Sequence, residues 1–446
     1  MNESLGLDKA RSRWPLVIAV LLGVSVLILV LVVSAPMIRR ERGATFSSVA
    51  EAQRPAGSLP SLLWHTNPGL VIEDMDCSFD GMQLAIATPK ALILTEGSTG
   101  RQSRSIHLQA SPRRVRFGAG GILVELGDPW QGEPSTKKPI WAFIRSGASE
   151  PSWVRPFESR AESAAVTFGD GSSLYLGVGN EVVSIDCADG TVRWRRGMGR
   201  PVEAICALAD SVCVSSGGNP FDEVHGVERS KGRITKLSSK DGSPIWNFGI
   251  PSENSVNALV ADRRNVYLGD LAYVPSGPPY KSGDIVSWPK PYLRALDLGS
   301  GKQIWKVDVN EVSDSNRAAF DGLHRILLAD GTLYCLEWSN TFRAVSIQGS
   351  VLWTLRCGYC STFVKTGQWL VLGSGSYHGK EDNGLFAVNA MDGKRIWSHA
   401  TLPEDEGGQV AALVCGGDRF FAMCCPGTFT WKKPAKHHLY AFEVKH

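Results

Sequence analysis

Short apolar runs rich in β-branched and aromatic residues alternate with turns from Leu62 to the end of the chain. The stretch around Trp305 shows the pattern most clearly: it predicts strands at 256–261, 265–269, 292–297 and 303–307, with a long loop over 270–291. The same order of four strands recurs along the chain. The other copies lie at 163–194, 202–246, 325–353 and 361–397, with weaker versions at 70–108 and 113–157.

A short signature accompanies these strands: an Asp, Asn or Ser, a Gly four residues later, and a Trp four residues after that. Four copies are Asp186-Gly190-Trp194, Ser238-Gly242-Trp246, Asp297-Gly301-Trp305 and Asn389-Gly393-Trp397. A copy one residue shorter ends at Trp353. Two degenerate copies, which we call worn because part of the signature is replaced, end at Arg104 and Trp153. A recurring Gly turn with an aromatic anchor indicates a repeat protein, and a period of roughly 40–60 residues suits one four-stranded propeller blade.

The two ends of the repeat region complement each other. After Trp397 we expect only three more strands, at 409–415, 419–424 and 438–444. The missing Trp-bearing strand is available at Leu62 to Trp64, so we predict that it pairs with the last strand and closes the ring. Counting the fourth strands predicts an all-β propeller of eight blades; seven is the alternative if 70–157 forms fewer blades.

The pattern from Arg294-Ala295-Leu296-Asp297 through Gly301 to Trp305 resembles the repeat of the PQQ-type quinoprotein β-propeller superfamily. The resemblance covers about residues 62–446. The superfamily includes quinone-dependent alcohol dehydrogenases and non-enzymatic, BamB-like members, and this chain is most similar to the latter. The resemblance implies the fold more strongly than the function, because unrelated activities share one fold.

An apolar segment, Leu16 to Ala35, precedes the repeats and contains no charged residue. At about 1.5 Å per residue it is long enough to cross a bilayer, so we expect a transmembrane helix rather than a cleaved signal peptide. The expected organisation is a leading segment at 1–15, the helix at 16–37, a flexible linker at 38–59 and the propeller at 60–446. Lys and Arg balance across the span; the short leading segment favours a propeller outside the cytoplasm, periplasmic or extracellular.

The composition gives no support for nucleic acid as a partner and does not decide the chemical state of the cysteines. The net charge is only +3, which gives no argument for nucleic acid. Cys206 and Cys213 could face each other across a hairpin and form a disulfide, although small apolar strand residues are the preferred interpretation. Zinc held by Cys357, Cys360 and the Cys424-Cys425 pair is a weaker alternative to a local disulfide or free thiols.

Long insertions fall at one place in several repeats, between the second and third strands: 127–139, 216–232, 270–291, 374–383 and 425–437. Antiparallel strands place these insertions on one face of the ring, a common position for a binding surface. Aromatic residues next to basic ones suit a protein partner or an envelope polymer; the alternative is that they pack over the ring. The candidate residues are Trp130, Phe221, His225, Arg229, Tyr273, Tyr280, Trp288, Tyr377, His378, Trp431, Lys432 and Lys433.

No familiar catalytic motif appears in the sequence: there is no HExxH, no G-x-S-x-G and no phosphate-binding loop. We predict no catalytic, metal or cofactor residues and expect no cofactor. The leading hypothesis is a membrane-anchored, protein-binding scaffold, with cell-envelope assembly as its context. The alternatives are a dehydrogenase that uses PQQ and calcium, or a ligand-sensing propeller.

Overall fold

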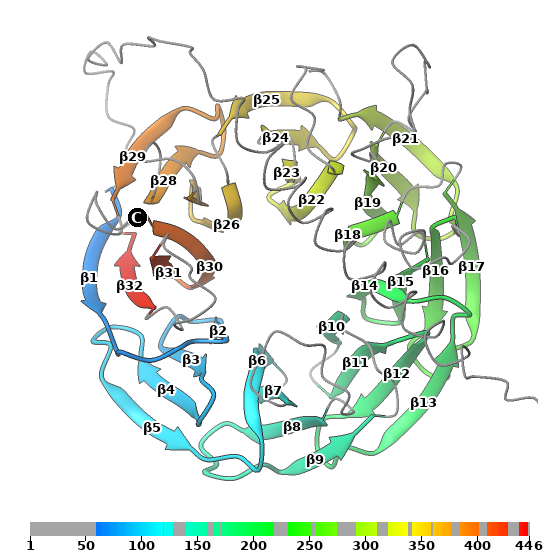
Figure 1. Cartoon of the computed structure of the whole chain (residues 1–446). Helices are drawn as coiled ribbons and strands as arrows, with labels where there is room; N and C mark the ends of the chain where they lie inside the picture. The colour runs from blue at the N-terminus through cyan, green and yellow to red at the C-terminus, as the bar shows by residue number, and fades with distance from the viewer. Residues whose placement is uncertain are drawn as a thin grey trace, which may run out of the picture. The chain divides into compact units, whose positions relative to one another are not determined.

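Eight antiparallel four-stranded blades surround a central axis (Figure 1). The computed structural model describes residues 59–444, apart from 119, 128–139, 158–164, 170–171, 218–230, 251–254, 274–290, 310–319, 338–340, 358–359, 376–383, 401–407 and 427–436. In each blade the first strand lies next to the axis and the fourth lies on the rim (Figure 1). The eight-bladed prediction is confirmed, and with it the assignment of two blades to the worn region 70–157.

The strand bounds follow the expected order along the chain. Blades 1 and 2 contain β2 (Asp74–Cys77), β3 (Gln83–Ala87), β4 (Leu92–Glu96), β5 (Gln102–Ile106), β6 (Ser111–Gly118), β7 (Gly121–Gly127), β8 (Ile140–Arg145) and β9 (Trp153–Pro156). Blades 3 and 4 contain β10 (Ala165–Phe168), β11 (Ser173–Val178), β12 (Glu181–Asp186), β13 (Val192–Gly197), β14 (Val202–Ala207), β15 (Ser211–Ser216), β16 (Arg233–Ser238) and β17 (Pro244–Gly249).

The second half repeats the same plan. Blades 5 and 6 contain β18 (Ser255–Ala261), β19 (Asn265–Tyr273), β20 (Tyr292–Asp297), β21 (Gln303–Asp308), β22 (Phe320–Ala329), β23 (Thr332–Glu337), β24 (Thr341–Ser346) and β25 (Val351–Arg356). Blades 7 and 8 contain β26 (Cys360–Thr366), β27 (Trp369–Ser374), β28 (Gly384–Asn389), β29 (Arg395–His399), β30 (Gly408–Gly416), β31 (Arg419–Pro426), β32 (His438–Glu443) and, from the other end of the chain, β1 (Ser61–Thr66).

The ring closes as predicted. β1 pairs antiparallel with β32, from Ser61 opposite Glu443 to Thr66 opposite Leu439. Figure 1 shows the N-terminal strand completing the blade that holds the C-terminal strand. The pairing gives β32 a second neighbour and leaves blade 8 with four strands like the others, which removes an open sheet edge inside the ring.

The repeating tryptophans hold consecutive blades together. Six indole N–H groups donate to a backbone carbonyl in the turn between the third and fourth strands of the next blade. The pairs are Trp64 with Gly97 (2.9 Å), Trp153 with Cys187 (3.0 Å), Trp194 with Ser239 (2.9 Å), Trp246 with Leu298 (2.9 Å), Trp305 with Ile347 (3.0 Å) and Trp353 with Ala390 (3.0 Å). The aromatic ring buries area while its one polar atom is satisfied, which explains why tryptophan recurs here.

The Asp and Gly of the signature shape the turn that receives this indole. Asp297 Oδ1 accepts hydrogen bonds from the backbone N–H and the hydroxyl of Ser300, at 2.7 and 2.6 Å. Gly301 follows with φ +69°, and a Cβ on it would lie 2.6 Å from the Trp246 ring. Only glycine combines this conformation with such a close approach. The signature therefore encodes a seam between blades.

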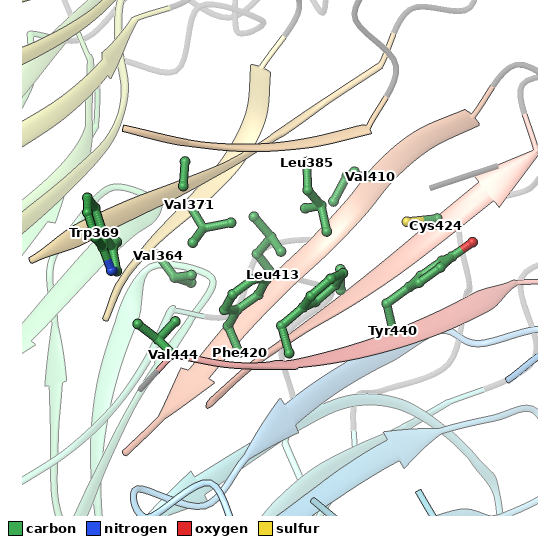
Figure 2. Close-up of a cluster of buried hydrophobic side chains, with 13 residues drawn as sticks. Val364, Trp369, Val371, Leu385, Val410, Leu413, Phe420, Cys424, Tyr440 and Val444 are labelled. Atoms are coloured by element: carbon green, nitrogen blue, oxygen red, sulfur yellow. The ribbon is translucent and has the colours of Figure 1, made fainter. Parts of the chain in front are cut away.

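Apolar clusters fill the space between neighbouring blades. Figure 2 shows the cluster between blades 7 and 8, where Trp369 and Val371 of β27 lie across from Phe420 of β31 and Tyr440 of β32. Trp369 and Phe420 are fully buried. Because each sheet buries both faces against its neighbours, the inner and middle strands are apolar nearly throughout, as β11 is (SLYLGV).

The predicted membrane segment lies outside this description. Leu16 to Ala35 and the expected ranges 1–15, 16–37 and 38–59 precede or barely reach the first described residue, Leu59. Across the described part of the chain, no helix has the length and apolar character needed to cross a bilayer.

Candidate functional site

The predicted insertions all leave the ring between the second and third strands of a blade. They connect β7 to β8, β15 to β16, β19 to β20, β27 to β28 and β31 to β32. Inner strands start from the blade-to-blade connections, and antiparallel order then brings the second strand of each blade back to that same end. We call this end of the ring the insertion face and the other end the turn face.

Most of the predicted partner-binding residues fall outside the described residues. Tyr273 is the exception, because it ends β19, where its backbone pairs with that of Phe320 in β22. The others lie in stretches that the structure does not describe: Trp130, Phe221, His225, Arg229, Tyr280, Trp288, Tyr377, His378, Trp431, Lys432 and Lys433. The strands that flank each insertion define the frame of the candidate face.

Blades 5 and 6 have the most reinforced part of this frame. The sequence predicts a loop from residue 270 onward, but β19 continues to Tyr273 and its last residues pair with the start of β22. Leu271 lies opposite Gly322 and Ala272 opposite Asp321. This pairing joins the two blades into a single eight-stranded sheet at the insertion face. The correction is local: the loop starts four residues later because a neighbouring blade offers a free strand edge.

Buried ion pairs lie beneath this joint. In blade 5, Arg294 Nη2 lies 2.9 Å from Asp270 Oδ2, and both side chains are almost fully buried. In blade 6, Arg343 Nε lies 2.5 Å from Glu337 Oε1, with both side chains equally buried. Each carboxylate comes from the end of the second strand and each guanidinium from the start of the third, so each pair holds the two strands together where an inter-strand connection departs.

One of these arginines also crosses between blades. Arg343 Nη2 donates to the carbonyl of Val309, the residue that follows the outer strand of blade 5, at 3.1 Å. A buried guanidinium stays charged, so its contribution to stability depends on the acceptors that its N–H groups reach. The predicted-loop residues 274–290 therefore start from a rigid, cross-linked base. Sequence analysis missed both pairs; the only signal was an acidic residue ending one apolar strand with an Arg early in the next.

Blades 1 and 2 meet through carboxylates of the inner strand β2. Asp74 Oδ2 accepts from the backbone N–H of Val115 at 3.1 Å and lies 2.6 Å from Arg116 Nη1. Asp76 Oδ2 accepts from the N–H of Phe117 at 2.8 Å. Burial raises the pKa of Asp76, partly opposed by the Phe117 hydrogen bond and by Arg116. Side chains of β2 thus satisfy backbone donors along β6 that no strand pairs with.

A pocket opens on the insertion face of blade 3, where the connection between β11 and β12 is only two residues long. Its volume is about 410 Å³, and Phe157, Val178 and Val183 contribute its apolar lining. Glu181 and Arg195 supply the charged part of the wall and lie 3.6 Å apart. A mixed polar and apolar pocket of this kind could receive the side chain of a protein partner.

The cysteine predictions are resolved by the strand register. Cys206 and Cys213 lie directly opposite each other in β14 and β15, as predicted, and both are free thiols. Burial raises the pKa of Cys206 to about 11 and that of Cys213 to about 12, which makes them unreactive. Cys424 and Cys425 lie inside β31 rather than at the start of a loop, because the strand extends to Pro426.

The zinc alternative finds no support in the described residues. Cys360 begins β26 in blade 7, and Cys424 lies in β31 of the adjacent blade 8. Within the part of the chain that the structure describes, no group of three or more His, Cys, Asp or Glu side chains is placed to hold a metal ion.

Comparison with known proteins identifies the family. The family model described as outer membrane protein assembly factor BamB matches residues 133–288 and 289–433, about two thirds of the chain. The outer membrane protein assembly factor BamB of Yersinia pestis is 21% identical over 314 residues, which cover 65% of this chain and 69% of that protein.

Solved structures agree on the fold. BamB from Moraxella catarrhalis superposes with a TM-score of 0.57 at 14% identity, covering 87% of this chain and 99% of that one. The C-terminal WD40 domain of Sif2 gives a TM-score of 0.60 at 10% identity, with the same coverage. At these identities the likeness shows the propeller fold alone. The family match, read with the Asp-Gly-Trp seams of the ring, shows that the chain belongs to the family of the outer membrane protein assembly factor BamB.

Proposed function

We propose that this chain is an extracytoplasmic protein-binding scaffold, anchored to a membrane by Leu16 to Ala35, that presents its insertion face to a protein partner in cell-envelope assembly. The observation that carries the proposal is the placement of the insertions. Five of the eight blades insert residues between the second and third strands, and all five connections depart from one face. The opposite face has short turns, such as the one centred on Gly301.

The chemistry of that face supports a protein partner. The insertions contain aromatic residues beside basic ones, for example Trp431 with Lys432 and Lys433. Aromatic and Arg side chains are the groups that dominate protein–protein binding energy. The pocket of blade 3 adds a recess with Glu181 and Arg195 at its wall.

The frame beneath the insertions supports the same proposal. Buried ion pairs and the β19–β22 pairing hold the ends of the connections in blades 5 and 6. A rigid base reduces the entropy lost on binding, because fewer groups have to be ordered. The context of envelope assembly rests on the relatives, which are named as outer membrane protein assembly factors.

The test is site-specific photo-crosslinking of the full-length chain in its native envelope. A photoreactive residue at Tyr280 or Trp431 is expected to give a discrete crosslinked partner. The matched control is Phe79, which is 96% exposed in a turn of the turn face, between β2 and β3. Crosslinks from Phe79 but not from the insertions would contradict the proposed face.

A loop replacement gives an independent measurement. Residues 274–290 are exchanged for a Gly/Ser segment of equal length, which leaves the pairing of Tyr273 with Phe320 in place. We expect the thermal midpoint to change little and partner capture to fall by about tenfold or more, since anchor residues typically contribute over 2 kcal/mol each. Unchanged capture by the folded variant would remove this insertion from the binding surface.

A further inference from the structure

Four histidines gather where the ring closes, at the insertion-face end of blade 8. His65 lies in β1, the strand supplied by the N-terminal end, and His437 and His438 lie at the start of β32. His399 ends the outer strand of blade 7. His65 and His438 are 373 residues apart in the sequence, yet their ring nitrogens lie 3.0 Å apart.

The hydrogen bonds around His438 determine which of its ring nitrogens carries a proton. Asn67 Oδ1 accepts from the backbone N–H of Gly69 at 3.0 Å, so the amide nitrogen of Asn67 is the atom that faces His438 Nε2, at 3.2 Å. An amide nitrogen only donates; His438 Nε2 must therefore accept and carry no proton. The remaining proton of neutral His438 is on Nδ1, which donates to His65 Nε2. His65 Nε2 is then also unprotonated, and the chain of bonds requires both rings to be neutral.

His437 makes a second bond of the same kind. Its Nδ1 accepts from the backbone N–H of Ile72 at 2.8 Å, and the side chain is only 9% exposed. The His437 backbone N–H in turn donates to the carbonyl of Leu70. Ile72 and Leu70 belong to the segment that leads from β1 into blade 1. Neutral histidines thus tie both β1 and the chain that follows it to the start of β32.

Within the described residues, these rings pack against aromatic side chains and against one another. His65 stacks on Tyr440 with centroids 4.3 Å apart and on His438 at 5.3 Å, and His399 meets Tyr440 edge-on at 5.9 Å. In the neighbouring strand β31, the backbone of Cys424 lies opposite that of His438, and Cys425 follows Cys424 in the chain. Figure 2 shows Cys424 and Tyr440 side by side at one end of the apolar cluster.

We propose that His65 and His437, bonded to His438 and to Ile72, form a pH-sensitive latch, which holds the ring closed while the two rings are neutral and loosens the pairing of β1 with β32 when they are protonated. Protonated His65 would direct an N–H at the N–H group that His438 donates. Protonated His437 would lose its acceptor for Ile72. The latch concerns closure of the ring and does not depend on the partner proposed above.

The direction of the pH effect follows from the environment. Burial and the neighbouring His438 and His399 lower the pKa of His65, and burial with His438 lowers the pKa of His437 to about 4. The unfolded chain therefore binds more protons than the folded chain below a pH of about 6.5. The stability that these groups contribute is complete above that pH and is lost as the pH falls towards their folded values.

The first experiment compares thermal midpoints at about pH 7.5 and about pH 5 for the full chain and for the H65Q/H437N variant. Gln places an amide oxygen near the position of Nε2 and Asn places one near Nδ1, so both hydrogen bonds survive without a titrating group. We expect the wild-type midpoint to fall on acidification by roughly 2 °C or more beyond that of the variant. The control is His107→Gln, at an exposed position between blades 1 and 2, which should retain the wild-type pH dependence.

Hydrogen exchange of the unmodified protein tests the latch without relying on variants. After correction for intrinsic rates, the amides of His65 and Thr66 in β1 should exchange faster at about pH 5 than at about pH 7.5, whereas those of β13 should not. Equal protection of β1 at both pH values, or a variant that retains the full wild-type pH dependence, would overturn the proposal.

Discussion

The seam between blades 4 and 5 and the seam between blades 1 and 2 perform the same task with different side chains. In the first, the Trp246 indole donates to Leu298 and packs on Gly301. In the second, Arg104 occupies the equivalent position in the fourth strand, opposite Leu94, and its Nη1 donates to the carbonyl of Ala148 at 2.5 Å. The worn copy of the repeat keeps the hydrogen bond while it loses the aromatic ring.

This difference shows which part of the signature the fold requires. At both seams a donor in the outer strand reaches a carbonyl in the next blade, and either an indole or a guanidinium can do so. The apolar area that tryptophan would bury is absent at Arg104, and blades 1 and 2 have additional contacts from Asp74 and Asp76 to β6. The seam between blades 5 and 6 is the opposite extreme, because it has the tryptophan, a crossing arginine and paired strands.

The largest effect is expected from breaking the ion pair at the seam of blades 5 and 6. Arg343→Met should lower the free energy of unfolding by about 3–5 kcal/mol, because it leaves the buried Glu337 carboxylate without its guanidinium. Denaturant unfolding measures the change. The double variant E337L/R343M should recover much of the lost free energy of unfolding, because it also removes the carboxylate. If the single and the double variant lost equal stability, the pair would stabilise the seam by more than the compensation of its two charges.

A smaller effect is expected where glycine receives the tryptophan. Gly301→Ala should cost about 1–3 kcal/mol, since φ is +69° and the new methyl group would lie 2.6 Å from Trp246. Gly299→Ala, in the same turn, is the matched control because its Cβ would meet only Asp297 Oδ1, at 3.4 Å. Similar losses for both, measured by thermal unfolding, would mean that the turn itself rather than the seam is sensitive.

The smallest effect is expected at the worn seam. Arg104→Met removes the donor to Ala148 but keeps the length of the side chain, and should cost about 0.5–1.5 kcal/mol. Arg104→Trp restores the residue found at the other seams and should cost less or stabilise the ring. If the tryptophan variant were the less stable one, the Asp74 and Asp76 contacts would have shaped this seam around the arginine.

Much of the fold was accessible from local pattern. The Trp positions predict the fourth strand of each blade, and the register confirms them: Trp305 lies opposite Ala295 as Trp353 lies opposite Ala344. The strand ends were predicted less well. β19 extends to Tyr273 because its last residues pair with β22 of the next blade. No sequence property of residues 270–273 indicates this pairing.

The candidate site, like the fold, was predicted only in part. The placement of the insertions follows from strand order, which the repeat makes visible in the sequence, and the structure has the flanking strands where they were expected. The framework that holds the insertions was missed. Asp270 pairs with Arg294 24 residues later, and spacing alone cannot show that two such charges meet in a buried position.

The sequence alone determined the repeat and the closure by the N-terminal strand, because both depend on short-range periodicity and on strands left unpaired at the two ends, and it favoured eight blades over seven. Only the tertiary structure decided which polar groups meet. Arg343 reaches Val309, Asp76 reaches β6, and His65 reaches His438 across nearly the whole length of the chain. These contacts arise because ring closure brings together residues whose separation in sequence carries no local signal, and burial then forces each polar atom to find a partner.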